Sequence, residues 1–534
     1  MKRVLSVVVA FTLALLTVGC TEQRAPEKEG VQIVLSDDAI TVDGTPATHD
    51  ETAAVYTAND IVFYLAGQDF TYGAGGEADA HTQTEADAHT VVHIAKPGIY
   101  RVSGTLSAGQ IAVDLGEGAE EDESAVVTLV LDGADLTCNV APAIIFYRVY
   151  ECGSTDAEMA SERVDTSAAG ANIILADGST NTINGSYVAR IYKSYTLSAD
   201  GTEVIDNKKL HKYDGALYSK MSMNVSGESD GSGILNINAE NEGLDSELHL
   251  TVNSGNVNIV SGNDGINTNE DGISVTTING GAVSICVSGA TGEGDGIDSN
   301  GYLVINGGTV VVSACADSED AGIDSDCGIY LNDLGKLNVD HASVSVIRPT
   351  TCGIYLEQEP ELVGTEILFP RGGYWNGQQI VDPNGSATQS VVINPCNVFL
   401  GTIDSRWDVE GNWSNDILPN NYSKVHIAAP CVSDDNIQVR EIVIDDSGSL
   451  NLVNDAVLTV DNIVNDDPAK HKKVTDELGI QYNQLIDNVD KNACGIYGIN
   501  GIPHIMLIDK DGTILARNLR GDTIEAAVKE ALAK

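Results

Sequence analysis

The sequence predicts a mainly β protein whose largest part is a right-handed parallel β-helix. A short motif of Gly, an aliphatic residue, Asp or Asn, and Ser or Thr recurs along the chain. Apolar and polar residues alternate between the copies, and no helical pattern is long enough for a helical repeat. Repeats of about 20–50 residues are typical of solenoids, in which each repeat forms one coil.

The repeat occurs four times, at residues 242–259, 264–285, 295–312 and 321–339, with its glycines at Gly243, Gly265, Gly296 and Gly322. An earlier copy begins at Asp214 and contains one extra residue. Leu303 and Ile305 alternate with outward-facing residues, as expected of a strand. Gly, Asn and Asp bound each strand and suit corners between strands. We expect one coil per repeat, with the right hand that parallel crossovers adopt.

Stacked coils bring the acidic motif residues into files with a spacing of ~4.8 Å. One file contains Glu242, Asp264 and Asp295, and the other contains Asp245, Asn267, Asp298 and Asp324. Residues 221–335 include 18 Asp and Glu but no Lys or Arg. Neighbouring carboxylates would repel by roughly 1 kcal/mol in water and ~3.5 kcal/mol at an effective dielectric of 20.

The acidic files predict bound calcium, which prefers six to eight oxygen ligands. The alternative is that these side chains cap the corners through hydrogen bonds. Asn267 and Ala321 replace acidic residues of neighbouring copies, so sites at these coils would be weaker or absent.

The composition limits the classes of partner. The formal net charge of −49 argues against nucleic acids and anionic membranes as partners. A hydrophobic content of 42% argues against a disordered acidic chain. Nine cysteines follow Cys20 without a CxxC pair, so we expect no structural zinc site and at least one unpaired thiol in a monomer. The oligomeric state stays open.

The N-terminus predicts export. Lys2 and Arg3 precede an apolar run that ends in "LTVGC", as in a signal peptide. This sequence resembles a bacterial lipobox, which implies cleavage before Cys20 and a lipid on its sulfur. Thr21 in place of Asp implies transfer to the outer membrane or cell surface in a two-membrane bacterium. Ordinary signal cleavage is the alternative, and the only expected membrane contact is the lipid anchor.

Residues 40–346 resemble exported bacterial β-helix proteins described as carbohydrate-binding, which are calcium-binding relatives, in fold, of polysaccharide lyases. The resemblance depends on the order of "IAKPGIYRVSGTLSAGQIAVDL", "VTLVLDGADLTC", "ANIILADGSTNTING", "YDGALYSKMSMNVSG" and the repeats. It implies binding of a plant-type or acidic polysaccharide, with calcium either structural or bridging to uronate carboxylates. The predicted β-helix domain spans residues 21–397, after a signal peptide at 1–20.

Binding without catalysis is the expected activity. Elimination from a uronate needs a base and a cation beside the reacting carbon. Within the repeats His249 is the candidate base, and further basic residues flank them: Lys212, Lys220, Lys336, Arg348 and Arg371. A calcium-dependent lyase is therefore the alternative, and a protein-binding adhesin is a third class.

Aromatic residues and a duplicated segment are further candidate sites. Tyr302, Tyr330, Tyr374 and Trp375 could stack on sugar rings. "EADAHT" occurs at 77–82 and 85–90, and its acidic and histidine side chains could hold a transition metal. We favour a duplicated loop for this segment.

Two smaller units are predicted after the β-helix. Residues 398–466 resemble a small β module of secreted proteins, with Trp407 and Trp413 in its local core. Residues 467–534 resemble the second half of a TlpA-type thioredoxin-like domain, with Pro503 at the position of its cis-proline and two strands joined by Lys-Asp-Gly. The redox CxxC is missing and Cys494 is solitary, so thiol-disulfide exchange is a further alternative.

Overall fold

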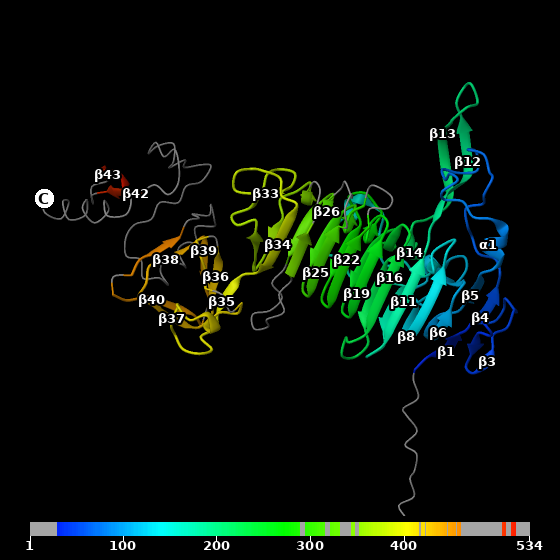
Figure 1. Ribbon diagram of the computed structural model, residues 1–534, viewed down its shortest axis with the longest axis horizontal. Coiled ribbons are helices and arrows are strands. Elements are labelled where there is room, and N and C mark those ends of the chain that lie inside the picture. Colours follow the sequence, from blue (N-terminus) through cyan, green and yellow to red (C-terminus); the bar gives the residue numbers. More distant parts are fainter. Residues whose placement is uncertain are drawn as a thin grey trace, which may run out of the picture.

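The computed structural model describes residues 29–460, except for 289–293, 315–320, 332–342, 348–351, 416–417, 422, 446 and 455, together with two strands at 505–508 and 514–519. The predicted signal peptide and lipidation site at Cys20 lie outside these residues. So do Lys336, Arg348, Cys494 and Pro503. The described chain is mainly β, and its long parallel sheets stack along one axis as predicted for a β-helix (Figure 1).

Three strands build each coil of the central solenoid. The coils comprise β14 (Gly215–Ser219), β15 (Met223–Gly227) and β16 (Ile234–Ala239); β17 (Glu242–Ser246), β18 (His249–Val252) and β19 (Asn256–Ser261); β20 (Ile266–Thr268), β21 (Val275–Ile278) and β22 (Ala282–Val287); β23 (Ile297–Ser299), β24 (Tyr302–Ile305) and β25 (Thr309–Ala314); and β26 (Ala321–Ser325), β27 (Gly328–Leu331) and β28 (Ser343–Ile347). The next coil begins with β29 (Cys352–Leu356) and β30 (Glu361–Leu362).

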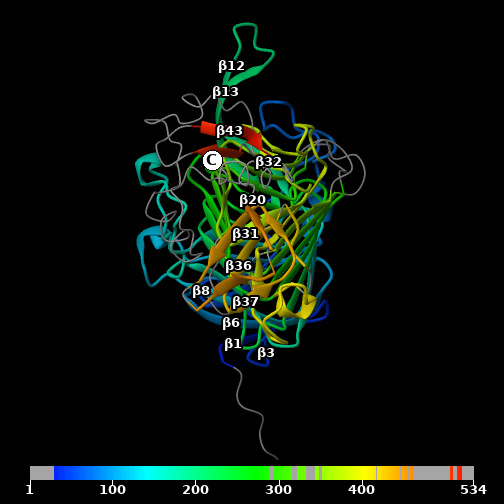
Figure 2. The same cartoon turned by 90° about the vertical axis from the view of Figure 1, so that its left-hand side faces the viewer.

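Equivalent strands of successive coils pair in parallel and form three faces. We call the face of β14, β17, β20, β23, β26 and β29 the first sheet. The face of β15, β18, β21, β24, β27 and β30 is the second sheet. The view along the solenoid shows how the coils superimpose (Figure 2).

The N-terminal part extends these sheets. It contains β1 (Val31–Leu35), β2 (Thr41–Val42), β3 (Thr45–Pro46), β4 (Val55–Ala58), α1 (Gln83–Asp87), β5 (Thr90–Ile94), β6 (Gly98–Leu106), β7 (Gly109–Asp114), β8 (Val127–Cys138), β9 (Ile144–Arg148), β10 (Ala171–Leu175) and β11 (Thr180–Gly185). An antiparallel hairpin, β12 (Val188–Leu197) and β13 (Val204–Tyr213), projects from the coils in both views (Figures 1 and 2).

The repeated motif has a structural reason at each position. Its aliphatic residue points inward, so that Ile266, Ile297 and Ile323 pair in register in the core. Its Ser or Thr is buried at the following corner, where the Oγ of Ser299 donates a hydrogen bond of 2.8 Å to the carbonyl of Tyr302. Its Gly permits close approach of the next coil, because a Cβ on Gly296 would lie 2.6 Å from the carbonyl oxygen of Gly322.

Replacing this glycine is expected to destabilise the solenoid. Gly296→Ala forces the backbone of the two coils apart, which should lower the free energy of unfolding by about 1–3 kcal/mol in urea titrations. Gly76→Ala is the control, since its nearest neighbour would be Asp79 Oδ2 at 3.6 Å. Equal effects of the two substitutions would contradict close packing as the reason for the motif glycine.

The C-terminal end contains a second, smaller hydrophobic core. The solenoid ends with β31 (Thr365–Phe369), the hairpin of β32 (Tyr374–Trp375) and β33 (Ile380–Val381), and β34 (Ser390–Pro395), preceded by the short β30. Parallel strands follow as β35 (Asn397–Phe399), β36 (Lys424–Ile427) and β39 (Glu441–Ile444); β37 (Pro430–Ser433) and β40 (Ser449–Leu452); and β38 (Ile437–Val439) and β41 (Leu458–Val460). Trp407 and Trp413 pack edge to face in this core, with ring centroids 4.6 Å apart.

The described part of the tail is one strand pair. β42 (Ile505–Ile508) and β43 (Ile514–Leu519) are antiparallel, as the sequence predicts for these residues. The thioredoxin-like resemblance of the whole segment stays a prediction.

The duplicated segment folds as a structural loop around α1. Thr82 and Glu85 form a reciprocal capping box at the start of α1. His89 is buried and its Nδ1 lies 2.8 Å from the carbonyl oxygen of Glu85, while its Nε2 accepts a hydrogen bond from the Asn139 amide. Asp79 accepts hydrogen bonds from Gly76 and Tyr187. These contacts support the loop interpretation over a metal site.

The described chain contains both buried and partly exposed free thiols: Cys138, Cys396 and Cys431 are buried, and Cys152 and Cys327 are partly exposed. Cys138 and Cys431 are free, and burial raises the pKa of each thiol to about 12. Cys286 is part of a disulfide. The expected unpaired thiol is therefore present, and Cys138 and Cys431 are in an unreactive setting.

None of the helices in the described part of the chain has the length and apolar character that a membrane crossing requires.

Candidate functional site

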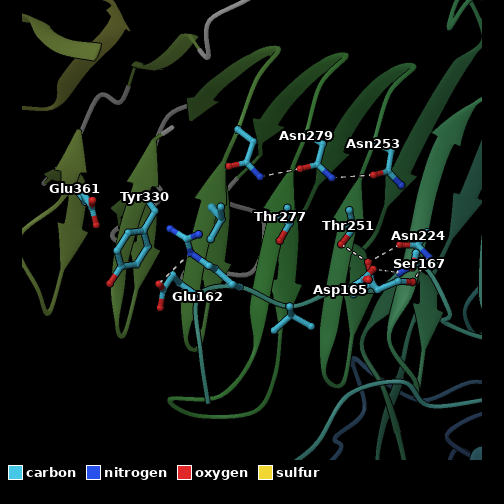
Figure 3. Close-up of a pocket in the computed structure, with 15 residues that line it drawn as sticks. Glu162, Asp165, Ser167, Asn224, Thr251, Asn253, Thr277, Asn279, Tyr330 and Glu361 are labelled. Carbon is cyan, nitrogen blue, oxygen red and sulfur yellow. Dashed lines mark hydrogen bonds and ion pairs between the residues drawn. The ribbon is translucent and has the colours of Figure 1, made fainter. Parts of the chain in front are cut away.

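The second sheet carries a groove with a volume of about 600 Å³ (Figure 3). Its floor is a file of outward-facing residues that pair in register across successive strands: Asn224, Thr251, Thr277, Val304, Tyr330 and Glu361. The groove therefore crosses the strands and follows the solenoid axis.

A ladder of asparagine amides forms one side of the groove. The Nδ2 of Asn279 donates to Oδ1 of Asn253 at 2.9 Å, and the Nδ2 of Asn306 donates to Oδ1 of Asn279 at 2.8 Å. Each Asn precedes the glycine corner of its repeat, where Gly255, Gly281 and Gly308 have positive φ. The ladder fixes the amide orientations, and Asn279 retains half of its hydrogen-bonding capacity.

The other side is the connection between β9 and β10, of which residues 162–167 line the groove. Thr166 anchors it, because its Oγ1 donates to Oδ1 of Asn224 at 2.7 Å and lies 2.6 Å from Oγ1 of Thr251. Asn224 returns a hydrogen bond of 2.7 Å to the Thr166 carbonyl. Figure 3 shows this segment passing over the sheet.

The predicted aromatic residues separate into two places. Tyr330 lines the groove, and the ring of Tyr302 lies beside it at a centroid distance of 5.8 Å. Tyr374 and Trp375 instead lie on the hairpin of β32 and β33. Tyr374 is exposed, whereas Trp375 packs on the solenoid core and its Nε1 donates to the Leu356 carbonyl at 3.2 Å. The structure thus does not bring all four together.

The acidic files on the first sheet stack as predicted. Asp245, Asn267, Asp298 and Asp324 pair in register from β17 to β26. Glu242, Asp264 and Asp295 occupy the preceding corner, where the Gly243 amide bonds to the Asp264 carbonyl and the Gly265 amide to the Asp295 carbonyl, each at 2.9 Å.

In the part of the chain that the structure describes, only one cluster of acidic side chains lies close enough together to hold an ion. Carboxylate oxygens of Asp214, Glu242 and Asp245 lie within 4.8 Å of one another, and all three residues are buried. Of the predicted ligands, Glu242 and Asp245 belong to this acidic triad. The other predicted ligands are stacked farther along the files and do not join it: Asp264, Asn267, Asp295, Asp298 and Asp324.

Side-chain hydrogen bonds hold three of the remaining motif residues: Asp264, Asn267 and Asp298. Oδ1 of Asp264 accepts from the Asp295 amide at 2.7 Å. Asn300 Nδ2 lies 3.2 Å from Oδ1 of Asn267 and 3.4 Å from Oδ2 of Asp298. The hydrogen-bonded interpretation therefore applies at these corners, and the acidic triad is the place where a metal ion could be held.

The acidic triad has the chemistry of a hard-cation site. Burial and the neighbouring carboxylates raise the pKa of Glu242 and of Asp245 well above the ordinary values. Glu242 Oε2 and Asp245 Oδ2 are buried and have no hydrogen-bond partner among the described residues. An oxygen-only donor set with unsatisfied carboxylate oxygens fits calcium.

Lys212, one of the basic residues that flank the repeats, lies beside the acidic triad. It comes from the root of the β12–β13 hairpin, and its Nζ lies 2.6 Å from Oδ2 of Asp214. Although burial opposes it, the adjacent Asp214 raises the pKa of Lys212 above its ordinary value. The sequence interpretation did not include Asp214 or Lys212 in the predicted ion site, because the extra residue in the first copy shifts Asp214 and because Lys212 precedes the stretch that contains no Lys or Arg.

The described candidate bases lie outside the groove lining. His249 is 3% exposed, its Nδ1 accepts a hydrogen bond from the Val275 amide at 3.1 Å, and burial lowers its pKa to about 4. His249 is therefore a neutral core residue. Lys220 and Arg371 are exposed away from the groove lining.

The fold and the groove define a parallel β-helix with an axial groove rich in hydroxyl and amide groups. The chain belongs to the family of carbohydrate-binding domain-containing proteins, whose model matches residues 88–359. A carbohydrate-binding domain-containing protein of Acetivibrio thermocellus is 28% identical over 169 residues, which cover 32% of this chain and 44% of the relative. The match thus spans less than half of that relative's length.

A solved structure is also similar. It is a polysaccharide lyase-like protein from C. thermocellum, solved as a gadolinium derivative, with 22% sequence identity and a TM-score of 0.37. The match covers 63% of this chain and 96% of that chain.

Proposed function

We propose that this protein binds a polysaccharide along the second-sheet groove without chemically converting it. The observation that carries the proposal is the register of the floor, in which equivalent residues repeat from β15 to β30. Their ~4.8 Å spacing is close to the length of an extended sugar residue. A row of side chains at a regular spacing suits an extended ligand whose units also repeat.

The lining has the chemistry that sugars require. Amides and hydroxyls of Asn279, Thr277 and their neighbours can donate to and accept from sugar hydroxyls. Tyr330 offers a half-buried aromatic surface for the apolar face of a sugar ring. The groove thus combines fixed polar groups with one aromatic contact.

The proposal includes calcium and a cell-envelope location. Asp214, Glu242 and Asp245 would hold the ion, which would neutralise their mutual repulsion and stabilise the solenoid. The lipobox ending at Cys20 supports export and a lipid anchor, which would display the solenoid at the outer membrane or cell surface.

A calcium-dependent lyase is the second candidate, favoured by the position of Lys212 beside the acidic triad. The raised pKa of Lys212 opposes it, because a protonated ammonium cannot act as the base. Incubation with polygalacturonate and calcium should therefore give no absorbance of unsaturated product. Absorbance that appears with the native protein and is lost in Lys212→Ala would establish the lyase.

Replacing the groove tyrosine tests the binding site. Tyr330→Ala is expected to weaken polysaccharide binding by about 0.5–1.5 kcal/mol, or roughly two- to tenfold, through loss of ring contact. Affinity electrophoresis in polysaccharide gels measures the change. Tyr374→Ala is the matched control, because Tyr374 is exposed and lies outside the groove. A larger loss in the control than in Tyr330→Ala would place the site elsewhere.

A further inference from the structure

We infer that the groove selects an uncharged polysaccharide and rejects polyuronates, an inference that rests on the proposed function above. The sequence predicts a plant-type or acidic polysaccharide, and this inference keeps only the polysaccharides that carry no charge.

The floor carries no charge over most of its length. From β15 to β27 the file consists of Asn, Thr, Val and Tyr side chains, and Glu361 on β30 is its first ionisable acid. The ladder of Asn253, Asn279 and Asn306 along the side is also uncharged. These groups recognise hydroxyls and supply no countercharge to a carboxylate.

The covering segment adds negative charge. Among the described residues that line the groove, Glu162, Asp165 and Glu361 are carboxylates and Arg163 is the single cation. The Nε of Arg163 lies 3.6 Å from Oε1 of Glu162, and 87% of its side chain is exposed. Arg163 therefore forms a long ion pair with its neighbour and is largely exposed to solvent, and carboxylates outnumber it in the lining.

The carboxylates of Glu162 and Glu361 also change the electrostatic environment of Tyr330 on the groove floor. Burial raises the pKa of Tyr330, and the charges of Glu162 and Glu361 raise it further. A negative charge on the Tyr330 ring is thus disfavoured, and a uronate carboxylate beside that ring would meet the same repulsion. A neutral sugar would not be repelled in this way.

Affinity electrophoresis with two soluble polymers tests the inference. Hydroxyethylcellulose serves as the neutral glycan and polygalacturonate as the anionic one, both at fixed calcium and at low and high NaCl. We expect at least about tenfold stronger retention by hydroxyethylcellulose at low salt. Salt should leave that retention unchanged and should strengthen the weak retention by polygalacturonate, because it screens the repulsion.

A charge variant identifies the residues responsible. The triple variant Glu162→Gln, Asp165→Asn and Glu361→Gln should raise the affinity for polygalacturonate about tenfold. The control variant Glu51→Gln, Glu117→Gln and Glu203→Gln removes the same formal charge from exposed sites outside the groove lining and should not raise it.

The outcomes separate this inference from the proposed function. Stronger binding to polygalacturonate than to hydroxyethylcellulose would overturn the inference and leave polysaccharide binding intact. Calcium-dependent binding of polygalacturonate that is lost in the groove triple variant would also overturn it, in favour of ion bridging. Binding to neither polymer would overturn the proposed function together with the inference.

Discussion

Calcium is expected to raise the melting temperature of the metal-free protein. Binding to the folded state alone, at a concentration about 100 times the dissociation constant, adds about 2.7 kcal/mol to the free energy of unfolding. The reason is the buried acidic triad of Asp214, Glu242 and Asp245, in which Glu242 Oε2 and Asp245 Oδ2 have no hydrogen-bond partner within the part of the chain that the structure describes. Thermal unfolding with EDTA and with added calcium measures the difference.

Variants with amide side chains test whether the acidic triad is responsible for the rise in melting temperature with calcium. The double variant Glu242→Gln and Asp245→Asn should lose the calcium-dependent rise and should gain stability in EDTA, because it removes the repulsion. Glu357→Gln is the control, since Glu357 is exposed at a corner of the same sheet. A full calcium response in the double variant would exclude this triad as the ion site.

The metal-free protein is expected to lose stability as the pH rises from 6.5 to 8. Burial, followed by the charges of Asp264, Asp324 and Asp326, raises the pKa of Asp298 to about 8. A carboxyl group with a raised folded-state pKa binds its proton more tightly in the folded state. Its stabilising contribution is therefore complete below the unfolded pKa and is lost as the pH rises toward the folded pKa.

The buried histidine of the core contributes little over this pH window. His249 has a folded pKa of about 4, so it contributes a slope only below its ordinary value of 6.5. Asp298 alone should account for about 1.5 kcal/mol between pH 6.5 and 8. Urea titrations in EDTA measure the slope, and Asp298→Asn should reduce it. A rise in stability over this window would contradict the pKa assignment.

The solenoid could be predicted because its physical cause is periodic. Inward Ile297 and Ile323, the close contact at Gly296 and the corner at Ser299 recur in every repeat, so the sequence pattern records them directly. The stacking of Asp245, Asn267 and Asp298 follows from the same register.

The two candidate sites were predicted less completely because each includes a residue outside the repeat. Lys212, at the root of the β12–β13 hairpin, forms an ion pair with Asp214 of the acidic triad. Residues 162–167, in the β9–β10 connection, line the groove. Such segments have no periodicity that places them on a particular face. Asn279 and Asn306, in contrast, precede visible glycine corners, so their ladder had a signal in the sequence.

Hydrogen exchange with and without hydroxyethylcellulose tests most directly whether the groove is the binding site. Bound polysaccharide should slow amide exchange in peptides that contain residues 162–167, Thr277 and Tyr330, and should leave the hairpin at Tyr374 unchanged. Protection confined to residues 374–381, with none along the second sheet, would contradict the account.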